Sequence, residues 1–172
     1  MPLACCFTAM EMQPMSARVL CLGNPLLADD AFGIVVAEQL RRLKPDLEVC
    51  ESLTSGFDLL DYTLGARRLL VIDTLQSGAV APGTVSIFRG EDVESVPGCS
   101  PHYIGLFEAL RLGRALKLDV PEEVTIIAVE LADCLTVGGE MHPSVRAAVS
   151  EVLEIVLRGP MASVCGRGGE NS

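Results

Sequence analysis

The sequence predicts an α/β fold in which helices cover both faces of a parallel or mixed sheet. Short apolar runs alternate with helical patterns along the chain, as in proteins built from β-α-β units. The chain is 49% hydrophobic but only 4% aromatic, with no Trp. Aliphatic side chains must therefore fill the core, as they do in parallel sheets buried on both faces. The length of 172 residues suits a single domain, and no internal repeat is visible.

The elements can be assigned in order from apolar runs and turn residues. A turn at Pro82-Gly83 precedes the fourth strand, and Pro143 suits the first turn of the last helix. The predicted strands cover residues 17–23, 47–53, 68–72, 84–88 and 124–129. The predicted helices cover residues 29–43, 57–64, 101–117 and 143–157. We therefore expect one domain over residues 17–158, an N-terminal extension over 1–16 and a flexible Gly-rich tail over 159–172.

Charge and cysteine content indicate which partners the protein can bind and in which compartment it works. The net charge is −10, and no basic stripe of the kind that binds nucleic acid is present. No apolar run approaches the roughly 20 residues that span a bilayer, and the N-terminus lacks the charged start of a secretory signal. The cysteine count is seven, which is odd, and no C-x-x-C occurs. These features predict a cytoplasmic protein with free thiols that binds neither nucleic acid nor membrane.

Two acids and a histidine follow predicted strands. Asp30, with Asp29 beside it, follows the first strand; Asp73 ends the third; His102 follows the fourth, at the start of a helix. In open α/β sheets, ligands bind outside the carboxyl ends of the strands. Two carboxylates and an imidazole at one such edge could bind a divalent transition ion. Each residue alone could instead cap a helix or a turn, and His142, before Pro143, is expected to do so.

The stretch from Gly23 to Gly33, GNPLLADDAFG, resembles the signature G-N-x-L-x-x-D-[DE]-x-x-G of the [NiFe]-hydrogenase maturation endopeptidases. Asp73, the Ser100-Pro101-His102 segment and the Thr54-Ser55-Gly56 turn match in order and approximate spacing. The resemblance implies a single-domain three-layer α/β/α fold with a twisted, mostly parallel five-stranded sheet. It implies an endopeptidase that removes the C-terminal extension of a hydrogenase large-subunit precursor after nickel insertion. Asp30, Asp73 and His102 would then be both the metal-contacting and the catalytic residues, with the nickel carried by the precursor.

The resemblance leaves the chemical type open between an aspartyl and a metallo endopeptidase. We expect a metal ion to polarise the scissile carbonyl and lower the pKa of bound water, with one carboxylate accepting a proton. Asp30 is the expected ligand, whereas Asp29 is expected to hold the turn or cap the helix. The sequence departs from the family pattern at Cys21, at Ala31 and at residues 129–131, which lack a frequent Pro.

Two alternatives remain at this stage. The first is a nickel-dependent chaperone that binds the large subunit without cutting it. The second is a receiver-like domain with a phosphoacceptor at Asp73. A receiver would carry a Lys after the fifth strand, and this chain has only Lys44 and Lys117.

Overall fold

The computed structural model describes residues 16–89, 101–133 and 135–159, with the side chains of residues 101–104 left out. The strands are β1 (Ala17–Leu22), β2 (Glu48–Ser52), β3 (Arg68–Leu75), β4 (Val85–Arg89) and β5 (Glu123–Glu130). The α-helices are α1 (Phe32–Leu43), α2 (Leu60–Thr63), α3 (Pro101–Ala115) and α4 (Pro143–Arg158). Two 3₁₀ turns, η1 (Asp29–Ala31) and η2 (Gly56–Leu59), precede α1 and α2. All these elements fall within residues 17–158, while the expected extension and tail lie almost wholly outside the described residues.

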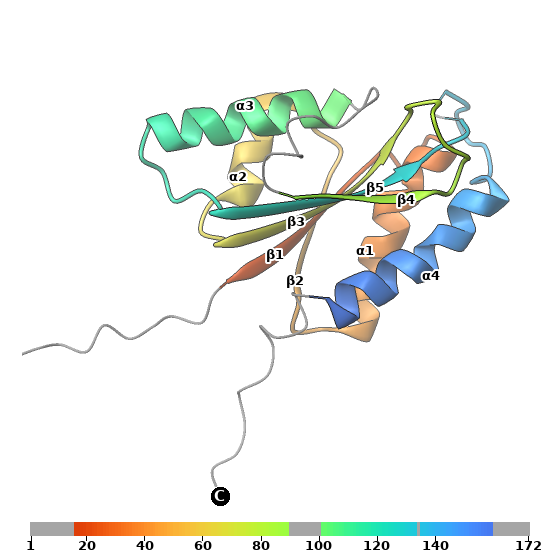
Figure 1. Cartoon of the computed structure of the whole chain (residues 1–172), viewed down its shortest axis with the longest axis horizontal. Coiled ribbons are helices and arrows are strands. Elements are labelled where there is room, and N and C mark those ends of the chain that lie inside the picture. The colour runs from red at the N-terminus through yellow and green to blue at the C-terminus, as the bar shows by residue number, and fades with distance from the viewer. Residues whose placement is uncertain (1–15, 90–100, 134, 160–172) are drawn as a thin grey trace, which may run out of the picture.

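The strands form one twisted sheet in the order β2-β1-β3-β5-β4 (Figure 1). Strands β2, β1, β3 and β5 are parallel to one another, and β4 pairs antiparallel with β5 at one edge. Helices α1 and α4 cover one face, and α2 and α3 cover the other (Figure 1). The predicted fold class, a three-layer α/β/α domain around a mostly parallel five-stranded sheet, is confirmed.

Apolar spacing accounts for both buried layers. In α1, Phe32, Val36 and Leu40 recur every four residues and pack into the core below α1 and α4. Along β3, Leu70 and Ile72 join that core, whereas Leu69, Val71 and Leu75 join the core below α3. This alternation is expected for a strand buried on both faces. No helix in the described part of the chain is both long and apolar enough to cross a bilayer.

Two expectations about strands are wrong in detail. The third strand does not end at Asp73 but continues to Leu75, because residues Asp73–Leu75 pair with Ala128–Glu130 of β5. The fourth strand runs against the others, so its end does not share their carboxyl edge. The predicted first helix also begins as the 3₁₀ turn η1 before α1 proper.

Candidate functional site

The candidate site lies where β1 ends before its neighbour β3. Pairing between β1 and β3 stops at Cys21–Ile72, whereas pairing between β3 and β5 continues as far as Leu75–Glu130. The last residues of β3 are therefore hydrogen-bonded as a ladder on one side only. The loop after β1, which carries the paired acids, occupies the other side.

Asp30 is held beside the end of β3 through both of its carboxylate oxygens. Oδ1 accepts a hydrogen bond from the hydroxyl of Thr74 at 2.9 Å, and Oδ2 accepts one from the backbone N–H of Asn24, also at 2.9 Å. The side chain of Asp30 is partly exposed. Each oxygen has lone pairs beyond the one used, so the carboxylate is fixed in orientation yet open to a further ligand.

The glycines of the motif let the acidic loop approach the strand end. Gly23 has φ +147°, and a Cβ there would lie 2.1 Å from the carbonyl oxygen of Asp30. A Cβ on Gly33 would lie 2.0 Å from the carbonyl oxygen of Leu22. Between them, Oδ1 of Asn24 accepts the N–H of Leu26 at 3.0 Å, the local turn expected of Asn. The motif is thus a compact loop in which a larger residue at either glycine would displace Asp30.

Asp73 lies next to this contact, inside β3. It is fully buried and faces Ala128 in the register with β5. Its Oδ1 accepts the N–H of Thr74 at 2.7 Å, and the same Thr74 donates its hydroxyl to Asp30. One residue therefore joins the two predicted acids, each through a different donor group.

Asp29 has a role quite different from that of its neighbour. It is fully buried and does not cap its own helix, so that part of the expectation is wrong. Its Oδ2 accepts the N–H groups of Ala132 (2.7 Å) and Asp133 (2.9 Å), and its Oδ1 accepts that of His142 (2.6 Å). It holds the loop between β5 and α4 against the β1 loop, because its oxygens satisfy three donors that would otherwise be unpaired.

His102 lies in the first turn of α3, but its side chain is outside the described part of the structure. The helix itself is anchored near the same edge of the sheet. A Cβ on Gly105 would lie 2.1 Å from the Cα of Gly56, in the turn that follows β2. This close contact keeps the start of α3 beside the loop after β2. Contact of the imidazole with either acid stays a prediction.

Among the described residues, no group of three or more His, Cys, Asp or Glu side chains is arranged to hold a metal ion. The imidazole of His102 lies outside the described residues, so the predicted set of Asp30, Asp73 and His102 stays a prediction. Asp30 and the neighbourhood of Asp73 are brought together through Thr74.

Sequence reasoning missed Thr74 and Glu130. A hydroxyl residue directly after Asp73 in an otherwise apolar strand was the available signal for Thr74. Glu130 is buried, and its carboxylate accepts the N–H groups of Ser77 and Gly78 and the hydroxyl of Ser77 at 2.7–2.9 Å. It orders the turn after β3 and has no sequence signal beyond its place at the end of an apolar run.

Two further expectations concern His142 and the thiols. His142 is the N-cap of α4 and accepts the N–H of Ser144 through Nδ1, as expected. Cys21 and Cys50 are free thiols. Burial, followed by the nearby Glu51 carboxylate, raises the pKa of the Cys21 thiol far above its usual range, so this thiol stays neutral.

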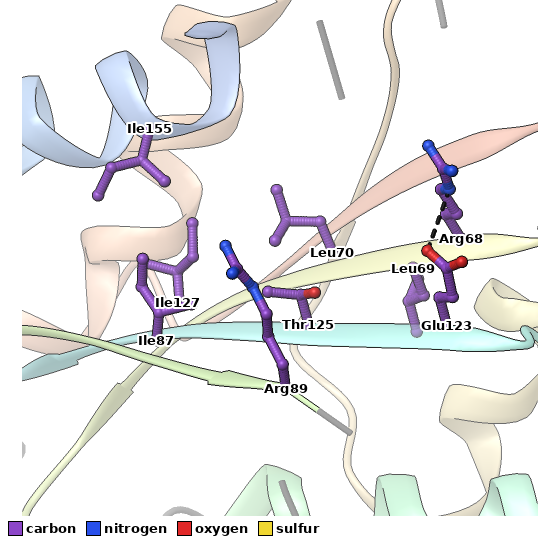
Figure 2. A pocket seen from close by; sticks show the side chains of 9 residues that line it. All are labelled: Arg68, Leu69, Leu70, Ile87, Arg89, Glu123, Thr125, Ile127 and Ile155. Carbon is purple, nitrogen blue, oxygen red and sulfur yellow. Dashed lines mark ion pairs between the residues drawn. The ribbon is translucent and has the colours of Figure 1, made fainter. Parts of the chain in front are cut away.

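A separate pocket lies at the other end of the sheet, below the last turns of α4 (Figure 2). Its walls include Leu70, Ile127 and Ile155, and Arg68 at its rim pairs with Glu123 over 3.1 Å. Arg68 and Glu123 are the first residues of β3 and β5. The pocket is therefore at the amino edge and forms no part of the acidic site.

Comparison with known proteins agrees with this architecture. The family described as hydrogenase maturation protease matches residues 34–159. The hydrogenase 2 maturation protease of Escherichia coli K12 is 33% identical over 148 residues, covering 83% of this chain and 89% of that protein. The solved structure of the hydrogenase maturating endopeptidase HybD from Escherichia coli is 31% identical, with a TM-score of 0.75 over 87% of this chain and 94% of that one.

A second solved structure, from another organism, has a similar fold. The [NiFe] hydrogenase maturation protease HybD of Thermococcus kodakarensis is 28% identical, with a TM-score of 0.70, over 84% of this chain and 98% of that one. Sequence, fold and chain length therefore agree across the domain. This chain belongs to the hydrogenase maturation protease family.

Proposed function

We propose that this protein is the endopeptidase that removes the C-terminal extension of a [NiFe]-hydrogenase large-subunit precursor after nickel insertion. Membership of the family supports a peptidase acting in hydrogenase maturation. The observation that carries the proposal is the fixed, partly exposed carboxylate of Asp30, hydrogen-bonded to Thr74 beside the buried Asp73. We infer that the reaction takes place in the cytoplasm, where thiols such as Cys21 and Cys50 stay reduced.

In this proposal the nickel is bound to the substrate, and residues of this protein contact it. Asp30 has both oxygens oriented by donors, and such a carboxylate can contact a cation without losing conformational freedom on binding. Asp73 would add a second negative charge, and His102 a nitrogen ligand. A carboxylate near the scissile bond can accept a proton from the attacking water. Recognition of the metal would thus restrict cleavage to precursors that have received it.

The test is to mix the purified protein with a cognate large-subunit precursor, with and without nickel, and to measure the mass of the large subunit. We expect shortening by the C-terminal extension only when nickel is present. Stable binding of the nickel-loaded precursor without shortening would instead support a chaperone.

Substitution of the predicted residues tests the site itself. Asp30→Ala, Asp73→Ala and His102→Ala are each expected to abolish trimming in a protein that remains folded by circular dichroism. Glu38→Ala, on the exposed side of α1, is a matched control that should trim normally. Normal trimming by all three site variants would overturn the assignment.

A further inference from the structure

Three large apolar side chains project into solvent next to the acidic site. Leu26 is 65% exposed, Leu135 is 83% exposed and Val137 is 74% exposed. Leu26 belongs to the loop after β1, and the other two belong to the loop after β5. We call these three side chains and their backbone the apolar ribbon. Apolar side chains that gather on a surface mark sites of interaction more often than scattered ones do.

The backbone that carries these side chains is firmly hydrogen-bonded. Leu27 and Val137 form an antiparallel bridge, and the N–H of Gly138 donates to the carbonyl of Leu26 at 2.8 Å. The carboxylate of Asp133 accepts the N–H of Leu135 at 2.8 Å. The three side chains are thus exposed on an ordered support, which lowers the entropy lost when a partner covers them.

The apolar ribbon is continuous with the site. The N–H of Ala28 donates to the carbonyl of Thr136 at 3.1 Å, and Ala28 is followed directly by Asp29 and Asp30. The Asp29 carboxylate then fixes the start and the end of the same loop through Ala132 and His142. The ribbon and Asp30 therefore belong to two loops that are hydrogen-bonded to each other, and a large protein bound at Asp30 can reach both.

We propose that the apolar ribbon is the docking surface for the body of the protein substrate, and that it contacts an apolar face of the folded precursor next to its cleavage segment. This inference rests on the proposed function. It assigns binding of the folded substrate to Leu26, Leu135 and Val137, and leaves the chemistry to the acids.

The charges around the ribbon favour this occupant over two others. The nearby Asp133 and Glu140 are acidic, and the chain carries a net charge of −10. Binding to an anionic membrane relies on clusters of Lys and Arg beside the apolar residues, and among the described residues that line the pocket with Asp133 and Glu140 the one cationic side chain is Arg146. A second copy of this chain would bring two strongly negative proteins together and would cover Asp30 in both. A protein partner with an apolar face is compatible with these charges.

The test is steady-state cleavage of the nickel-loaded precursor by wild type and by the double variant Leu135→Ser/Val137→Ser. We expect KM to rise about tenfold or more, because two apolar contacts are lost, while kcat stays within about twofold. Leu43→Ser is the matched control: Leu43 is 58% exposed at the end of α1, at the opposite edge of the sheet. It should leave both constants unchanged.

Folding is checked by thermal melting, and Leu135→Ala serves as a milder second variant whose KM should rise less. An unchanged KM in both variants, with wild type active, would overturn the ribbon proposal alone. No cleavage by wild type would instead contradict the proposed function. The proposal would also be overturned if wild type formed a dimer and the double variant a monomer. Binding of wild type, but not of the double variant, to anionic vesicles would overturn it as well.

Discussion

The hydroxyl of Thr74 donates a hydrogen bond to Oδ1 of Asp30 over 2.9 Å, joining residues that are 44 positions apart. Thr74 is buried, and its own N–H donates to Asp73. The residue therefore fixes one acid relative to the strand that carries the other. Several consequences of this arrangement can be measured.

Thr74→Val should lower kcat for precursor cleavage about tenfold, because the substitution keeps the shape but removes the donor that orients Asp30. The free energy of unfolding should fall by only about 1 kcal/mol. Thr74→Ser, which retains the hydroxyl, should restore most of kcat. A purely structural role would give equal loss of stability in both variants and no difference in kcat between them.

Substitution of Asp29 should mainly lower stability, whereas substitution of Asp30 should mainly lower activity. Asp29→Ala leaves three backbone N–H groups unsatisfied and should reduce the free energy of unfolding by about 3 kcal/mol or more, measured in urea. Asp30→Asn can keep both of its hydrogen bonds, since the amide oxygen can accept from Asn24 and the amide nitrogen can donate to Thr74. It should be nearly as stable as wild type and inactive. The reverse pattern would contradict the assigned roles.

Gly23→Ala should destabilise the protein by about 3 kcal/mol or more, because its Cβ would meet the Asp30 carbonyl at a backbone angle that disfavours side chains. Gly65→Ala is the matched control, with φ +79° and open space around the position of the new Cβ. It should cost about 1–2 kcal/mol, the backbone term alone. Equal losses of unfolding free energy in the two variants, measured in urea, would show that the close approach at Gly23 does not affect stability.

Cys21 should resist alkylation in the native protein. Its raised pKa keeps the thiol protonated, and its side chain is fully buried. Peptide mapping after iodoacetamide treatment at pH 8 should find Cys50 modified well before Cys21, and both modified in urea. Rapid native modification of Cys21 would contradict its place in the core.

The raised pKa of the Cys21 thiol also makes the free energy of unfolding fall at high pH. The unfolded thiol ionises above a pKa of about 8.5, whereas the folded one holds its proton. The unfolded state is therefore favoured progressively as pH rises above that value. Cys21→Ala should show a smaller loss of unfolding free energy between pH 8 and pH 10 than wild type.

The sequence alone determined the elements and the acidic loop. Apolar periodicity and turn residues are local properties, so they located β1, α1 and α4 within a few residues. The family resemblance rested on the same contiguous stretch, from Gly23 to Gly33. All of this depends on neighbours within about ten positions.

The contacts of the two neighbouring acids are set by the tertiary structure. The family resemblance pointed to Asp30 as the ligand, but the local pattern gives neither acid's contacts: Asp29 meets Ala132 and His142, more than a hundred residues away, while Asp30 meets Thr74. The true end of β3 and the antiparallel direction of β4 likewise depend on pairing with β5. Strand pairing and buried hydrogen bonds join distant segments, and their geometry is set by packing rather than by local periodicity.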